Sequence, residues 1–171
     1  MPSSRTLIAS NTLGSNASSV TFSSIPSTYK DLVLRLSART TASSTINLVV
    51  ITPNGTPSAS FIRLRGSGSS ASSSSSTGES TWYTGLVSGN TATANTFGSI
   101  EVYIPNYASV ANRVYSTFAV QENNNAVAYI DNYAGLDSQT AALSSFTIYD
   151  GTFSTNFVAG SSFFLYGLKN S

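Results

Sequence analysis

Short alternations of apolar and polar residues recur along the whole chain, and helical periodicity is missing almost throughout. The clearest examples are residues 32–36 (Leu-Val-Leu-Arg-Leu) and 100–104 (Ile-Glu-Val-Tyr-Ile). A period of two places one set of side chains on one face, as in a half-buried antiparallel strand. Similar runs of β-branched and aromatic residues are separated by Gly, Asn, Pro and Ser at intervals of about 8–15 residues, which indicates a β-sandwich or barrel.

This pattern predicts an all-β fold with eleven strands. They are expected near residues 5–9, 18–24, 31–39, 45–51, 58–65, 80–87, 99–105, 113–121, 126–134, 143–149 and 162–168. Turn-forming sequences lie between successive strands, at residues 52–55 (Thr-Pro-Asn-Gly), 122–125 (Glu-Asn-Asn-Asn) and 150–151 (Asp-Gly).

Two of these strands are apolar on both faces, namely residues 46–51 (Ile-Asn-Leu-Val-Val-Ile) and 163–168 (Phe-Phe-Leu-Tyr-Gly-Leu). An antiparallel strand of this kind is either central in the sandwich or covered by a partner. The sequence leaves both alternatives open.

Residues 66–80 are almost entirely Ser and Gly, a composition typical of linkers. Such a segment could divide two domains, but residues 1–65 offer too few strands to close a sandwich. We therefore expect one β-sandwich domain over residues 1–171, with residues 66–80 as a long exposed loop within it.

Ser and Thr make up nearly a third of the 171 residues, and charged residues only 9%, against about 25% in an ordinary soluble protein. A hydroxyl-rich surface suits a protein that lies against other proteins, because a hydroxyl costs less to bury than an ion. A plain secreted or surface β domain fits this composition nearly as well.

The charges are unevenly distributed. Residues 1–65 hold six basic side chains and one acidic, whereas residues 66–171 hold two basic and six acidic. The two halves either pair inside one sandwich or form complementary surfaces between neighbouring copies. The second alternative predicts a head-to-tail homo-oligomer. The basic side of that interface would come from Arg35, Arg39, Arg63 and Arg65. No strongly basic face is present, so we expect no nucleic-acid partner.

The chain contains no Cys and no His, which removes thiolate chemistry, Cys-ligated metals and the commonest general base. Ser27 and Lys30 have the Ser-x-x-Lys spacing, but Lys169 does not follow it and no Gly-x-Ser-x-Gly sequence occurs. The carboxylates of Glu101, Glu122, Asp131 and Asp137 form no evident glycosidase pair. We expect no enzyme activity, no cofactor and no metal, and residues 131–137, which faintly resemble a calcium loop, are better explained as a strand and a turn.

The N-terminal residues have no apolar run of signal-peptide length, and no stretch approaches the ~20 apolar residues of a membrane span. Aromatic pairs at Trp82-Tyr83 and at Tyr103 with Tyr107 could stack on sugar rings. The same residues serve equally as core or as interface anchors, and we include Trp82 and Tyr83 among the interface candidates.

Three stretches carry a family resemblance. They are residues 20–36 (Val-Thr-Phe-Ser-Ser-Ile-Pro-Ser-Thr-Tyr-Lys-Asp-Leu-Val-Leu-Arg-Leu), residues 104–107 (Ile-Pro-Asn-Tyr) and residues 161–168 (Ser-Ser-Phe-Phe-Leu-Tyr-Gly-Leu). Together they resemble small virion structural proteins of tailed bacteriophages, especially cyanophages. The resemblance implies a jelly-roll-like β-sandwich located in the virion, assembled in the host cytoplasm and exposed on the particle surface.

Within that class, the short single domain favours a capsid cement or decoration protein that binds across subunits of the major capsid protein. A trimer would suit a site of local three-fold symmetry on the capsid lattice. The alternative is a tail-fibre or receptor-binding module that holds host glycans on exposed aromatic residues. Copy number in the virion distinguishes the two, since cement implies hundreds of copies.

Overall fold

The computed structural model describes residues 5–122, 124 and 128–169, and it is all-β. Its strands are β1 (Arg5–Thr12), β2 (Ser19–Phe22), β3 (Asp31–Ala38), β4 (Ile46–Pro53), β5 (Ala59–Ser67), β6 (Ser70–Glu79), β7 (Trp82–Ser88), β8 (Gly98–Ile104), β9 (Arg113–Gln121), β10 (Tyr129–Asp137), β11 (Phe146–Asp150) and β12 (Ser162–Leu168). No helix in this part of the chain is long and apolar enough to cross a membrane.

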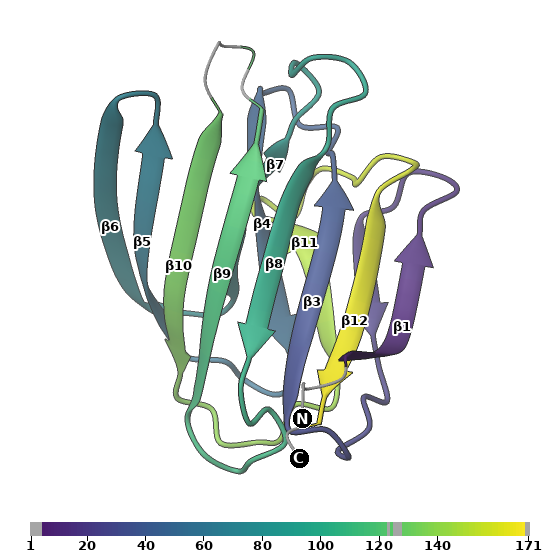
Figure 1. Cartoon of the computed structure of the whole chain (residues 1–171), viewed down its shortest axis with the longest axis vertical. Helices are drawn as coiled ribbons and strands as arrows, with labels where there is room; N and C mark the ends of the chain where they lie inside the picture. Colours follow the sequence, from purple (N-terminus) through teal and green to yellow (C-terminus); the bar gives the residue numbers. More distant parts are fainter. Residues whose placement is uncertain (1–4, 123, 125–127, 170–171) are drawn as a thin grey trace.

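The strands form two antiparallel sheets. The large sheet has the order β1-β12-β3-β8-β9-β10-β5-β6, and the small sheet has the order β2-β11-β4-β7. Figure 1 looks onto the large sheet, with the small sheet behind its central strands. The predicted antiparallel β-sandwich is therefore confirmed.

Eight of the strands form a jelly roll. When β5, β6, β9 and β10 are set aside, the remaining strands, renumbered 1 to 8 along the chain, lie in the orders 1-8-3-6 and 2-7-4-5. This is the arrangement of two four-stranded sheets in a jelly roll. We call these eight strands the core, and the hairpins β5–β6 and β9–β10 the extension. The two hairpins come from distant parts of the sequence, and they lie side by side because β10 pairs with β5.

The core strands follow the predicted alternation. Leu32, Leu34 and Leu36 of β3 point between the sheets and are at most 3% exposed, and the apolar residues of β8 pack beside them. The two strands with two apolar faces are both interior strands of their sheets, β4 between β11 and β7 and β12 between β1 and β3. Of the two explanations for these strands, the central position is the one that the structure supports.

The prediction of a long loop at residues 66–80 was wrong. Residues 70–79 form β6, the longest strand, which pairs antiparallel with β5 across a tight turn. Ser has little intrinsic preference for strands, so the side chains give no strand signal. The backbone hydrogen bonds of the β5–β6 ladder nevertheless do not depend on side-chain identity.

Candidate interaction surface

The outer face of the extension carries most of the exposed apolar side chains of the molecule. Nine large hydrophobic residues are exposed in the described part of the chain, and six of them lie on this face. We call these six the extension patch: Ile62, Leu64, Val114, Phe118, Ile130 and Leu136. Ile62 and Leu64 are each 58% exposed, which is unusual for residues in the middle of a strand.

The strand register makes the patch contiguous. Leu64 of β5 lies opposite Asn132 of β10, which in turn lies opposite Phe118 of β9. Two rows further along the same face, Leu136 of β10 lies opposite Val114 of β9. Side chains in such rows are neighbours on one face of a sheet, so the six residues form one surface rather than scattered positions.

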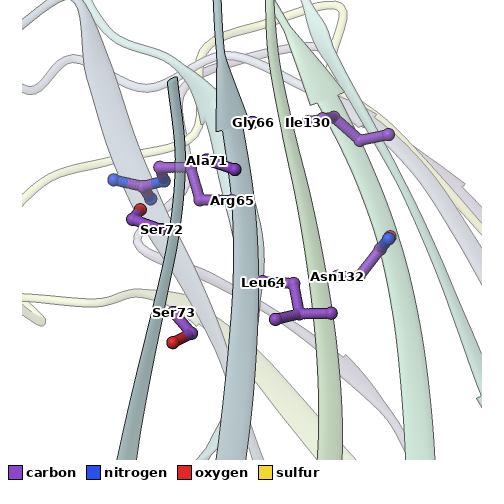
Figure 2. A pocket seen from close by; sticks show the side chains of 8 residues that line it. All are labelled: Leu64, Arg65, Gly66, Ala71, Ser72, Ser73, Ile130 and Asn132. Carbon is purple, nitrogen blue, oxygen red and sulfur yellow. The ribbon is translucent and has the colours of Figure 1, made fainter. Parts of the chain in front are cut away.

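Two shallow grooves run along β5 on this face. One, of about 470 Å3, lies between Ala71 and Ser73 of β6 and Ile130 and Asn132 of β10 (Figure 2). It is open at Gly66, where a Cβ atom would lie 2.8 Å from the Cγ2 of Ile130. The second, of about 380 Å3, lies further along the same strands and is lined by Ile62 and Leu136 together with Ser75 and Thr77. The grooves thus offer an apolar floor with a row of hydroxyl groups along one side.

The inner face of the extension combines buried polar groups with apolar side chains, and Ala59, Tyr115 and Ala119 belong to the hydrophobic core. Arg65 of β5 donates a hydrogen bond from Nε to the Oδ1 of Asp131 at 2.7 Å, and the carboxylate of Asp131 is fully buried. The guanidinium of Arg65 also lies over the ring of Tyr129, at 5.4 Å from its centroid. Beside them, burial raises the pKa of Tyr133, and a hydrogen bond from Arg63 lowers it in part.

A second buried polar group lies at the other end of the same face. Asp137 accepts a hydrogen bond from the Nε1 of Trp82 at 3.0 Å, and a nitrogen of Arg113 lies 3.8 Å from the same carboxylate oxygen. Burial lowers the pKa of Arg113, and the charge of Asp137 acts in the opposite direction. Tyr115 stacks on Trp82 with 4.8 Å between ring centroids. Gly135 makes room for that ring, because a Cβ atom there would lie 2.0 Å from the Cζ of Tyr115.

The extension therefore differs from the core on both faces. Its inner face holds the ion pairs of Asp131 and Asp137 among packed aromatic residues, and its outer face carries the exposed extension patch. Monomeric proteins rarely expose large contiguous apolar surfaces, and such surfaces mark interaction sites. The arrangement suits non-covalent contact with another macromolecule, with apolar residues and hydroxyl groups as the contacting atoms.

The six residues predicted for an interface are not brought together. Arg39 and Trp82 are buried: Arg39 is 8% exposed and donates hydrogen bonds to four carbonyl oxygens of the segment 90–96, and Trp82 is fully enclosed. In this fold neither residue offers surface to a partner. Tyr83 is half-buried against Phe61 and Tyr133.

The remaining three arginines lie on different faces. Arg35 is exposed on the outer face of β3 and bonds Glu101 at 2.7 Å, whereas Arg63 and Arg65 are on the inner face of β5. Tyr107 is fully buried and Tyr103 donates a hydrogen bond to Asp31, so the aromatic residues considered for sugar stacking form no exposed platform.

The uneven charges pair inside the chain. Arg5 and Arg35 both contact Glu101, at 3.6 and 2.7 Å, and Arg65 contacts Asp131. Each pair joins a basic residue of the first half to an acidic residue of the second. This supports internal pairing over complementary surfaces between copies, and the charge argument for a head-to-tail homo-oligomer loses most of its basis.

The carboxylates considered for catalysis have structural partners. Asp131 and Asp137 lie within β10, so residues 131–137 form the strand that was expected in place of a calcium loop. Glu101 binds arginine, and Glu122 accepts hydrogen bonds from Thr93 and Thr96. Among the residues that the structure describes, no three potential metal ligands gather at one place.

Sequence reasoning missed the extension patch and the strand β6. The signal for the patch was present as the alternation of Ile62 and Leu64 with Arg63 and Arg65. An amphipathic strand is ordinarily placed with its apolar side inward, and here the apolar side faces out. Only the buried carboxylate of Asp131 on the neighbouring strand reveals this orientation.

Comparison of the chain with protein-family models, with curated proteins and with solved structures finds no match. The structure itself defines the class of protein: a jelly-roll β-sandwich with a two-hairpin extension whose outer face is apolar and exposed.

Proposed function

We propose that the chain is a structural protein of a tailed-phage virion and acts there as a capsid cement protein, binding across subunits of the major capsid protein through the extension patch. The observation that carries this proposal is the extension patch, in which six exposed apolar side chains share the outer face of two hairpins whose ion pairs are buried on the other face. The placement in a virion rests on the family resemblance of residues 20–36, 104–107 and 161–168.

The physical role of the patch would be to bury apolar area at each attachment point. Burial contributes about 25 cal/mol per Å2 of apolar surface removed from water. One such contact is modest, but a capsid repeats it over hundreds of lattice positions. The low charge of the chain suits this role, because few ions have to be desolvated when the surface is covered.

The proposal is tested on purified virions by counting copies with quantitative mass spectrometry and by binding purified protein to capsids that lack it. Hundreds of copies per particle support a cement protein. A few copies, or a few tens, would contradict it and favour the tail-fibre or receptor-binding alternative.

A pair of variants tests the surface itself. Leu64→Glu and Phe118→Glu place charges in the patch and should reduce capsid occupancy at least tenfold, since a desolvated charge without a partner is costly. The matched control is Val110→Glu, because Val110 is 78% exposed but lies outside the patch, in the segment before β9. Equal occupancy of all three variants would exclude the patch as the attachment surface.

A further inference from the structure

The strand β6 forms one edge of the large sheet, at the far left of Figure 1. It is ten residues long, and in the described part of the chain only β5 pairs with it. Nearly all of its side chains are exposed. An edge strand presents a row of backbone N–H and C=O groups that can template a further strand.

Natural edge strands are usually blunted by charges, prolines or bulges. The opposite edge of the sheet follows this rule, since β1 begins at Arg5 and its register with β12 shifts between Leu7 and Ala9. In contrast, β6 has no charge and no proline from Ser70 to Gly78, and its pairing with β5 is regular from Ser70 to Ser76. The irregularity and Glu79 lie at its C-terminal end.

The sequence of β6 is also compatible with itself. Residues 72–76 are five consecutive serines centred on Ser74. In an antiparallel pair of two such strands with the two-fold axis at Ser74, Ser73 faces Ser75 of the second copy, and Ser72 faces Ser76. Directly opposed like charges would destabilise such a pair, and none occur here.

We propose that a second copy of this chain pairs its β6 antiparallel with this β6, which gives a two-fold dimer with one continuous sixteen-stranded sheet. The axis would be perpendicular to the sheet, so both copies of the extension patch would face the same side. The inference concerns the isolated protein and does not rest on the proposed function. It also differs from the head-to-tail contact expected from the charges and from the trimer expected from the resemblance, because the β6 contact is isologous and closes at two copies.

Disulfide trapping tests the position of the axis, because the chain has no native cysteine. Cα atoms of directly opposed strand residues lie about 4.5–5.5 Å apart, within the range that a disulfide spans. Under mild oxidation, Ser74→Cys should form covalent dimers about tenfold faster than Ser10→Cys on β1 or Ser116→Cys on the outer face of β9. The reason is that the proposed dimer holds the two thiols at position 74 opposite each other and so raises their effective concentration. Similar rates for all three variants would overturn the proposal.

A charge-pair experiment tests the contact without a cross-link. Ser73→Lys combined with Ser75→Lys, and the matching pair of Glu substitutions, should each give monomers in sedimentation at about 100 μM, where a millimolar contact is mostly dissociated. An equimolar mixture should restore a species of twice the 17.9 kDa chain mass. Circular dichroism is the control, and it should show the same β-sheet spectrum for both variants as for the unmodified protein.

The unmodified protein decides between the remaining outcomes. A dimer that the charge variants dissociate supports the proposal. A monomer at about 100 μM, a trimer, or a dimer that persists in the Lys variant would each overturn it. Pairing of β6 with an extended segment of a different protein would appear as a monomer in this experiment and counts against the proposal.

Discussion

The extension continues the large sheet of the core, but the two regions differ in the side chains that they bury and expose. The core encloses aliphatic and aromatic side chains between two sheets, as Leu34, Val102 and Leu165 illustrate with essentially no exposure. The extension continues the same hydrogen-bonded ladder, yet it buries the charged Arg65, Asp131 and Asp137 beside aromatic residues on its inner face and exposes large apolar residues on its outer face. Backbone pairing therefore does not dictate which face of a strand is apolar, and the two hairpins are free to carry an exposed apolar surface on a stable jelly roll.

The largest effect should come from removing the carboxylate that the extension buries. Asp137→Asn leaves the cation of Arg113 without its counter-charge and weakens the acceptor for Trp82 and for the backbone N–H groups of Ser58 and Gln139. We expect a loss of about 3–5 kcal/mol in the free energy of unfolding. Urea denaturation measures it, and a loss below about 1 kcal/mol would show that the ion pair is not what stabilises the inner face.

The exposure of the extension patch is tested by matched truncations. Leu34→Ala in the core should cost about 2–5 kcal/mol because it leaves a cavity. Leu64→Ala, the same change on the outer face of the extension, should alter the free energy of unfolding by less than about 0.5 kcal/mol. Both truncations are made in the Ser73→Lys/Ser75→Lys protein, so that monomers are compared, and thermal and urea unfolding measure the loss of stability. Equal losses would contradict the exposed position of Leu64.

A smaller effect on the free energy of unfolding is expected at acid pH from Asp150, the last residue of β11. Burial acts to raise the pKa of Asp150, but hydrogen bonds from the hydroxyl of Thr152 and from the backbone N–H groups of Thr155, Thr152 and Ser154 outweigh it and lower the pKa. Because the pKa in the folded state lies below that in the unfolded state, this stabilisation is complete above the ordinary carboxyl pKa. It is lost as the pH falls through the lowered value.

Asp150→Asn should therefore cost about 1.5–3 kcal/mol near neutral pH, the range for hydrogen bonds to a charged group. The variant should also show a shallower loss of stability between about pH 5 and pH 2. Unfolding curves across this pH range measure both quantities. Parallel curves for the two proteins would mean that Asp150 does not titrate abnormally.

The smallest effect should come from the surface pair on the outer face of the core. Arg35→Ala removes a contact of 2.7 Å with Glu101, but both side chains are substantially exposed and Arg5 remains beside the carboxylate. Exposed pairs contribute about 0–1 kcal/mol and are screened by salt. Chemical unfolding in low and high salt checks this, and a loss comparable with that of Asp137→Asn would remove the contrast between the two kinds of ion pair.

Much of the fold could be predicted from the sequence because the core strands obey simple rules. The alternation in β3 and β8 identified their buried faces, and the short apolar runs identified β4 and β12. The strand β6 could not be found in this way, since a run of serines has the composition of a linker and acquires its conformation only from pairing with β5. Periodicity also separates the two faces of a strand without saying which one is inward. Which face of β5 points inward depends on the ion pair between Arg65 and Asp131, which are 66 residues apart in sequence.

The position of β12 has a consequence for how the chain acquires its structure. This last strand lies between β1 and β3, so neither of those strands is paired to the other, and the ladder between them is completed only by residues 162–168. The hairpins β5–β6 and β9–β10 are local pairings, whereas the pairing of β1 with β12 joins the two ends of the described chain. Non-local pairings of this kind slow folding. During synthesis on the ribosome, the edge of β3 that pairs with β12 therefore stays unpaired until β12 has emerged.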